Sequence, residues 1–197
     1  MIARLHLHGL LVSLAVAYAL YIPLEIPQTP PKVKTPYLNI PDYCTLPTVT
    51  ATASGQWSDV TIWNTGKMPT AGDTVLIPQG MAVTYDVASM DVLKTVGVAG
   101  VLTFDPTMAT CMLVQTLLVY PTGELNVSAN EGVKAQIIFA DVPVDTAFDP
   151  EQYGNGLVVL GKVRTAGAAK TAFVRLAKAP KGGDNTLQLA SPVDGWA

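Results

Sequence analysis

The chain has 197 residues, of which 49% are hydrophobic and 14% are charged, and its formal net charge is −3. This length fits one domain with additional segments, and the composition excludes an intrinsically disordered chain. The negative charge by itself argues against binding a polyanion, and no nucleic acid is expected as a partner.

The first twenty residues have the features of a secretory signal peptide. Arg4 precedes an apolar run over residues 10–21, which contains alanines spaced as in A-x-A cleavage sites. Pro23 interrupts this run before it reaches the roughly 20 apolar residues of a membrane span. We therefore expect a signal peptide over residues 1–20 and a secreted or cell-surface protein. An uncleaved membrane anchor is the alternative.

Residues 21–48 are rich in proline, with seven prolines between Ile22 and Pro47. Such spacing favours an extended polyproline-type linker that has no packed core of its own. The folded domain is therefore expected to begin near Val49 and to occupy residues 49–197.

The chain has two cysteines, Cys44 at the end of the linker and Cys111 within the domain. In a secreted protein an even number of cysteines permits a disulfide, which here would fasten the linker to the first coils of the domain. The alternative is two unrelated thiols, with Cys111 acting as a small buried apolar residue.

The domain reads as a series of short strands separated by glycine and proline turns. No helical pattern lies between the strands, which excludes a βαβ architecture and leaves a sandwich, a barrel or a stacked solenoid. The expected strands are Val75–Ile77, Val83–Tyr85, Leu93–Val98, Val101–Phe104, Met112–Val119, Leu125–Val127, Gln136–Phe139, Leu157–Val163, Ala172–Leu176 and Thr186–Leu189.

A recurring unit favours the solenoid over the β-sandwich. Gly100–Phe104 is similar to Gly123–Val127 about 23 residues later, and Gly161–Val163 is a looser third copy. A period in the low twenties suits one coil per repeat, with each glycine at a tight corner. The Trp57–Trp63 segment is expected to cover the first coil. The end at Ala197 follows a predicted strand without a polar cap, which suggests a fragment of a longer protein with further C-terminal domains as partners.

The ordered set of motifs resembles the G-eight domain, a module named for its eight glycines. The similarity extends over nearly all of the chain after the linker, although Phe173 stands where relatives usually carry tryptophan. It implies a right-handed parallel β-helix and a role with extracellular polysaccharide, which is hyaluronan in the animal members. The motifs that carry the resemblance are Trp57, Trp63, Pro69–Pro78, Val83–Asp86, Val98–Phe104, Gly123–Val127, Gly132–Phe139, Leu157–Arg164, Phe173–Leu176 and Gly183–Leu189.

Asp73 and Asp86 are the candidate catalytic residues. Two carboxylates on neighbouring strands can divide the acid and base roles of glycoside cleavage if they lie roughly 5–10 Å apart. The resemblance adds that acids at these positions are linked to hyaluronan cleavage in animal relatives. Those relatives carry an arginine upstream of the first acid, where this chain offers only Lys67. The alternative is turn chemistry, in which Asp73 caps the turn at Gly72 and Asp86 ends a strand.

Half of the basic residues follow one another without an intervening acid. Of these, Lys162, Arg164, Arg175 and Lys178 are the candidate substrate-binding residues, because a basic stripe on a β surface can hold carboxylated or sulfated sugars. The alternative is an ordinary solvated face. The whole run contains Lys162, Arg164, Lys170, Arg175, Lys178 and Lys181.

No cofactor is expected, and calcium is the one metal that the sequence leaves open. The acidic residues Asp141, Asp145, Asp149 and Glu151 gather in a proline-containing loop, but their spacing fits no known ligand loop. A solvated insertion between coils is the alternative.

Three functions are compatible with these patterns. The first is a binding or adhesion module for extracellular polysaccharide of the hyaluronan type. The second is an endo-acting glycosidase that uses Asp73 and Asp86. The third is a structural spacer of a larger surface protein with no ligand.

Overall fold

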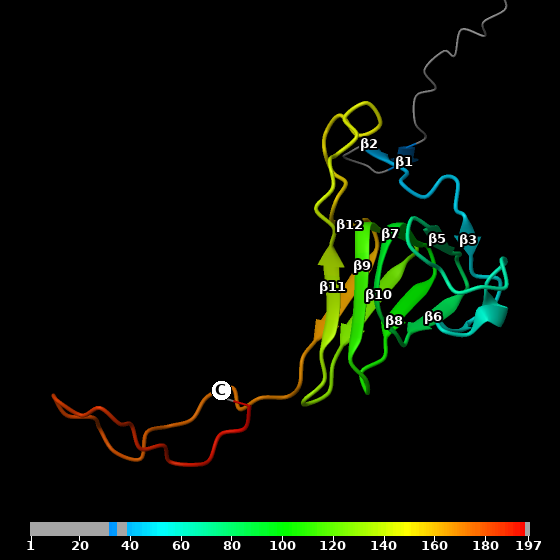
Figure 1. The fold of residues 1–197 in the computed structure, drawn as a ribbon. Coiled ribbons are helices and arrows are strands. Elements are labelled where there is room, and N and C mark those ends of the chain that lie inside the picture. Colours follow the sequence, from blue (N-terminus) through cyan, green and yellow to red (C-terminus); the bar gives the residue numbers. More distant parts are fainter. Residues whose placement is uncertain (1–31, 35–38, 196–197) are drawn as a thin grey trace, which may run out of the picture.

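The computed structural model describes residues 32–34 and 39–195. Within them the chain is all-β apart from one short 3-10 helix, η1 (Val60–Ile62). Successive coils stack into a solenoid in which each coil places a strand in each of two sheets (Figure 1). Every strand pair of these two sheets is parallel, so the predicted β-solenoid is confirmed and an antiparallel sandwich is excluded.

The two sheets follow the chain order of the coils. The six-stranded sheet contains β3 (Val49–Thr50), β5 (Thr74–Ile77), β7 (Ala88–Val98), β9 (Thr110–Val119) and β11 (Ala135–Phe139), with β12 (Leu157–Val159) also paired to β9. The five-stranded sheet contains β4 (Gly55–Gln56), β6 (Ala82–Tyr85), β8 (Val101–Phe104), β10 (Glu124–Ser128) and β13 (Lys162–Ala166). A separate antiparallel pair joins β1 (Lys32–Lys34) to β2 (Asn39–Pro41).

The interior consists of apolar residues stacked in register from one coil to the next. In the six-stranded sheet Val75 pairs with Val96, and Val96 pairs with Leu117. In the five-stranded sheet Leu102 pairs with Leu125, and all five of these side chains are buried. Successive residues of a strand point to opposite faces with a period of two. This register therefore keeps one apolar set of side chains inside along the whole stack.

Aromatic rings close the first coil. Trp57 lies edge-on to Trp63 at a centroid distance of 4.9 Å and to Tyr85 at 5.0 Å. The Trp63 indole N–H donates to the carbonyl of Trp57, which satisfies its buried donor. The segment predicted to cover this end of the solenoid therefore does so.

Glycines form the corners between the two sheets, as predicted. A Cβ at Gly100 would overlap the Met81 carbonyl oxygen, and a Cβ at Gly161 would overlap the carbonyl oxygens of Tyr120 and Gly123. The Gly100 carbonyl accepts from Glu124 N, directly after Gly123, so that successive corners lie one above another. Only glycine fits where backbones approach this closely.

Three strand predictions differ from the structure. The single strand expected over Leu157–Val163 is divided by the corner at Gly161 into β12 and β13. The segments Ala172–Leu176 and Thr186–Leu189 are not strands of the solenoid, and they meet only at one antiparallel bridge. The alternating pattern of a sequence predicts an extended segment. Whether that segment joins a sheet depends on which strand lies beside it, which the pattern does not specify.

Residues 39–46, which we call the N-terminal strap, cross the outer face of the six-stranded sheet. Ile40 is buried against Leu118 and Val158, and Cys44 is buried with its thiol donating to the Val75 carbonyl at 3.3 Å. Apolar residues before Val49 therefore pack onto the solenoid, and the domain boundary expected near Val49 stays a prediction. The signal peptide predicted over residues 1–20 lies outside the described residues.

Residues 171–194 form an antiparallel hairpin that leads away from the last coil (Figure 1). Thr171 N donates to Asp194 O and Ala177 N donates to Gln188 O, which places both pairs in one register. Among the described residues, no helix is long and apolar enough to span a membrane.

Candidate functional site

Asp73 lies in the turn before β5 and serves that turn. Its carboxylate accepts from Thr70 N at 2.8 Å and from the Thr48 hydroxyl at 2.7 Å. The first bond holds the local turn, and the second ties it to the preceding coil. This geometry is the turn chemistry that aspartate commonly performs.

Asp86 follows β6 and has an equivalent role. Its two carboxylate oxygens accept from Ser58 N at 2.9 Å and from the Ser58 hydroxyl at 2.6 Å. Both candidate catalytic acids therefore hold one coil against the coil before it. Their hydrogen-bond partners all come from the protein's own turns, and a catalytic role for Asp73 and Asp86 stays a prediction.

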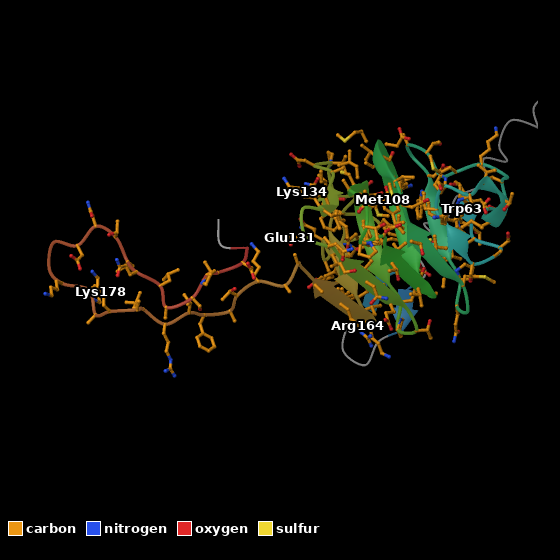
Figure 2. The ribbon with its side chains drawn as sticks, turned by 90° about the horizontal axis from the view of Figure 1, so that it is seen from below. Trp63, Met108, Glu131, Lys134, Arg164 and Lys178 are labelled. Carbon is orange, nitrogen blue, oxygen red and sulfur yellow. The ribbon has the colours of Figure 1, made fainter. Side chains whose placement is uncertain are left out.

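The structure does not bring the candidate substrate-binding residues together on one face. Lys162 and Arg164 lie on β13 at the edge of the solenoid, whereas Arg175 and Lys178 lie on the projecting hairpin. Figure 2 shows Arg164 on the body and Lys178 far from it on the hairpin. Arg164 is also within 3.7 Å of the carboxylate of Glu124 in an exposed ion pair.

The predicted disulfide between Cys44 and Cys111 is absent, and both thiols are free. Cys44 packs against Gly97, which pairs with Leu118 in β9. Cys111 lies seven residues before Leu118 on β9, which is roughly 23 Å away at about 3.3 Å per residue. A disulfide requires Cα atoms within about 7 Å, so the two cysteines cannot be bridged in this fold.

In the described part of the chain, the acidic loop included, no group of three or more histidine, cysteine, aspartate or glutamate side chains gathers. The Asp149 carboxylate is buried and accepts from Tyr153 N at 3.1 Å and Gly154 N at 2.7 Å. The Asp145 carboxylate accepts from Ala147 N at 3.0 Å. These acids order the loop itself.

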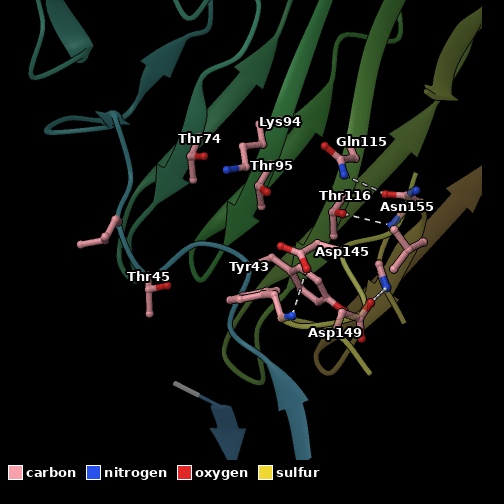
Figure 3. A pocket seen from close by; sticks show the side chains of 14 residues that line it. Tyr43, Thr45, Thr74, Lys94, Thr95, Gln115, Thr116, Asp145, Asp149 and Asn155 are labelled. Carbon is pink, nitrogen blue, oxygen red and sulfur yellow. Dashed lines mark hydrogen bonds between the residues drawn. The ribbon is translucent and has the colours of Figure 1, made fainter. Parts of the chain in front are cut away.

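A pocket of about 270 Å³ lies between the N-terminal strap, the outer face of the six-stranded sheet and the loop that contains residues 144–155 (Figure 3). We call it the strap pocket. Its lining residues are Tyr43, Thr45, Leu46, Thr74, Lys94, Thr95, Gln115, Thr116, Val144, Asp145, Phe148, Asp149, Gly154 and Asn155.

The floor of the strap pocket is polar because the strict alternation between inward-facing and outward-facing residues is interrupted there in β7 and β9. Leu93 and Val96 both belong to the interior core although they are three residues apart, so both residues between them can line the pocket. These residues are Lys94 and Thr95. The equivalent pair in β9, residues 115–116, lines the pocket in the same way.

Threonines form a ladder across this floor. Thr74 pairs with Thr95, and Thr95 pairs with Thr116, in the continuous parallel register of β5, β7 and β9. Asn155 extends the ladder, because its N–H donates to the Thr116 hydroxyl at 3.2 Å and its side-chain oxygen accepts from Gln115 Nε2 at 2.9 Å. The pocket thus presents hydroxyl and amide groups at regular intervals.

The charged side chains of the strap pocket differ in whether they have partners within the protein. The carboxylates of Asp145 and Asp149 accept hydrogen bonds from backbone N–H groups of their own loop. Within the described residues, Lys94 makes no ion pair. Its ammonium is therefore the one charged group lining the pocket that has no hydrogen-bond or ion-pair partner within the described residues.

Aromatic side chains form the remaining wall. Tyr43 of the strap and Phe148 of the loop meet edge-to-face at a centroid distance of 5.6 Å. The Tyr43 hydroxyl is buried without a hydrogen-bond partner of good geometry, and it lies near Asp149. Burial and the nearby Asp149 carboxylate raise the pKa of Tyr43 above its usual range, so that the hydroxyl stays protonated as a donor.

Comparisons with known proteins give one match. The model of the G8 domain family, the G-eight module, matches residues 62–177, which is more than half of the chain. The chain belongs to the G8 domain family. No curated protein and no solved structure matches it significantly. The matched range contains β5 to β13 and the sheet side of the strap pocket.

Sequence reasoning missed the strap pocket of this G8 domain. Lys94, Gln115 and Asn155 are far apart in the sequence and belong to no motif. The available signal was the repeated polar pair between apolar residues, Lys94-Thr95 before Val96 and residues 115–116 before Leu117. In a strand that alternates strictly, one residue of each pair would face the interior.

Proposed function

We propose that this G8 domain is an extracellular module, secreted or at the cell surface, that binds polysaccharide and holds an acidic sugar residue in the strap pocket. The observation that supports this function is the lining of the pocket. Hydroxyl and amide groups of Thr95, Gln115 and Asn155 line the same pocket as Lys94, together with aromatic rings and the carboxylates of Asp145 and Asp149. This combination suits a ligand that carries many hydroxyl groups and a carboxylate.

The size of the pocket limits how much of a polymer it holds. Its volume of about 270 Å³ is just below the range of about 300–1,000 Å³ that is usual for small-molecule sites. A single sugar residue or a chain end therefore suits it better than a long stretch of polymer. Carboxylated polysaccharides of the hyaluronan class are the ligands to test first.

Lys94→Ala is the decisive variant for this function. A hydrogen bond to a charged group contributes about 1.5–3 kcal/mol, so the loss of the ammonium is expected to weaken binding by about 10- to 100-fold. Binding of the purified chain to hyaluronan and to an uncharged polysaccharide is measured by calorimetry. The uncharged polymer is expected to bind more weakly and to be insensitive to the substitution.

Matched controls separate the pocket from the rest of the surface. Lys67→Ala removes a lysine outside the pocket and is expected to leave the affinity unchanged. The double variant Lys162→Ala with Arg164→Ala tests the basic pair on β13. An affinity lost in this double variant but kept in Lys94→Ala would reject the pocket as the binding site.

The same samples test the glycosidase alternative. Polymer length is followed over time with the wild-type chain and with Asp73→Asn and Asp86→Asn. Binding without a change in polymer length is the expected result. Shortening of the polymer that disappears in either variant would instead establish catalysis by that carboxylate.

A further inference from the structure

The five-stranded sheet contains a modification signal that has no part in the strap pocket. Asn126, Val127 and Ser128 form the sequence Asn-X-Ser, in which X is not proline. This tripeptide is the acceptor for N-linked glycans in secreted proteins. No other asparagine of the chain is followed by serine or threonine at the second position after it. The chain therefore offers a single acceptor for this modification.

The acceptor tripeptide lies within β10, with both of its functional side chains on the outer face of the sheet. Leu125 is buried, and Val127 packs against the interior core. Because side chains alternate along a strand, Asn126 and Ser128 both point away from that core. The amide nitrogen that receives the sugar and the hydroxyl that the signal requires are thus on the same side of the strand.

The outer face around Asn126 is open in the part of the chain that the structure describes. Asn126 is partly exposed, and its neighbours in register are Thr103 of β8 and Arg164 of β13. The N-terminal strap and the loop of the strap pocket contact the other sheet. The two apolar clusters of the described residues include no side chain from this outer face. A sugar attached at Asn126 therefore meets no apolar layer above the strand.

The hydrogen bond of the Asn126 side chain is compatible with the modification. Its Nδ2 donates to the Thr103 hydroxyl at 3.4 Å, which is long for a hydrogen bond. The amide nitrogen carries two hydrogens, and glycosylation replaces one of them. The modified nitrogen can therefore keep its bond to Thr103 while the sugar extends into solvent.

We propose that Asn126 carries an N-linked glycan when the chain passes through a secretory pathway that contains an oligosaccharyltransferase. This inference rests on the extracellular location of the proposed function. The donor is an oligosaccharide attached to a lipid diphosphate. Nδ2 of Asn126 forms a bond to the anomeric carbon of the first sugar, and the bond from that carbon to the diphosphate oxygen breaks. The lipid diphosphate leaves with the electron pair, and the amide releases one proton.

The glycan and the strap pocket lie on opposite sides of the solenoid. The two sheets enclose the same interior core, and the pocket is on the outer face of the six-stranded sheet. The glycan therefore shields the polar outer face of the five-stranded sheet and leaves Lys94 accessible. Removal of the glycan is expected to leave binding at the strap pocket unchanged.

Secretion of the full chain from a eukaryotic cell line tests the acceptor. The intact mass of the wild type is expected to exceed that of the polypeptide by the mass of a glycan. Digestion with peptide N-glycosidase is expected to remove the glycan and to convert Asn126 to aspartate, which peptide mass spectrometry locates. The same masses are measured for chains that remain in the cell lysate.

Four substitutions separate the signal from its surroundings. Asn126→Gln and Ser128→Ala are each expected to abolish the glycan, whereas Ser128→Thr keeps the signal and is expected to retain it. The Ser128 side chain makes no hydrogen bond within the described residues, so its removal takes no such bond from the fold. Asn130→Gln is the matched control, because it changes a nearby asparagine outside the signal and should leave the glycan in place.

A second series replaces residues 1–20 by a proven signal peptide, which separates the acceptor from the location of the protein. A glycan under both leaders supports the proposal. A glycan only under the replaced leader supports the acceptor and contradicts the extracellular location of the proposed function. A wild type without a glycan under both leaders, or a glycan that persists in Asn126→Gln, would overturn the proposal.

Discussion

The thiol of Cys44 lies directly over the Cα of Gly97, so that a Cβ added to Gly97 would be 2.7 Å from Sγ and 2.8 Å from the Cβ of Cys44. This contact joins the N-terminal strap to the middle of the six-stranded sheet. It also explains why the strap can cross the sheet closely at this point.

Gly97→Ala is therefore expected to destabilise the fold. The added methyl group must displace the strap or the strand, which typically costs about 1–3 kcal/mol in the free energy of unfolding. Gly156→Ala is the matched control, because a Cβ there meets no atom within 4 Å. Urea unfolding of both variants measures the difference. Equal stability of the two variants would contradict the close packing of Cys44 on Gly97.

The two thiols are expected to differ in reactivity. Cys44 is buried, and burial together with the Asp42 carboxylate raises its pKa to about 12, whereas Cys111 is partly exposed. Because the thiolate is the reactive form, alkylation of the native protein should label Cys111 first and both residues after unfolding. Peptide mass spectrometry without reduction checks this result. A cross-linked Cys44–Cys111 peptide would show that the fold differs from the one described.

Stability is expected to fall at alkaline pH through the strap. The pKa of Cys44 is raised from 9.0 to about 12 in the folded state, so its stabilising contribution is complete below pH 9 and is lost between these two values. The pKa of Tyr120 is also raised, by burial and by its hydrogen bond to Asp42. The free energy of unfolding of Cys44→Ala should decrease less steeply above pH 9, by up to about 1.4 kcal/mol per pH unit. Identical slopes for wild type and variant would argue against a buried thiol.

Asp86 and Ser58 are expected to contribute to stability as a pair. Ser58→Ala removes the hydroxyl bond to Asp86 and keeps the bond from Ser58 N, whereas Asp86→Ala removes both bonds. The coupling energy of such contacting residues is about 0.5–3 kcal/mol. A double-mutant cycle of Asp86→Ala and Ser58→Ala, measured by urea unfolding, gives this energy. Asp91→Ala, an exposed carboxylate nearby on β7, is the control and should change stability little. A coupling energy near zero would show that the bond between the Ser58 hydroxyl and Asp86 does not contribute to stability.

The repeated part of this fold could be predicted from the sequence because its signals are local. Apolar alternation marks the strands, and glycines such as Gly100 and Gly123 mark corners where no Cβ fits. The spacing between these glycines also predicts the register, since Leu102 and Leu125 follow them at the same distance and pair. Local chemistry therefore specifies the stack.

The strap pocket could not be predicted in this way. It depends on contacts between Tyr43, the sheet and the loop around Asp149, which are distant in sequence and follow no period. The proline-rich composition before Val49 gave no information on which apolar residues, such as Ile40, would find a surface to pack on. The orientation of the hairpin after β13 could not be predicted from the sequence for the same reason.

The N-terminal strap changes how the solenoid is expected to respond to force and heat. Stacked coils interact mainly with their immediate neighbours, and such arrays tend to lose terminal units one at a time. The strap departs from this nearest-neighbour rule, because Cys44 bonds to Val75 in the coil of β5 while Ile40 packs on Val158 at the other end of the sheet. A segment that contacts several coils couples their stability, so that unfolding of a terminal coil also removes contacts of coils further along the stack. The solenoid is therefore expected to unfold in a single thermal transition.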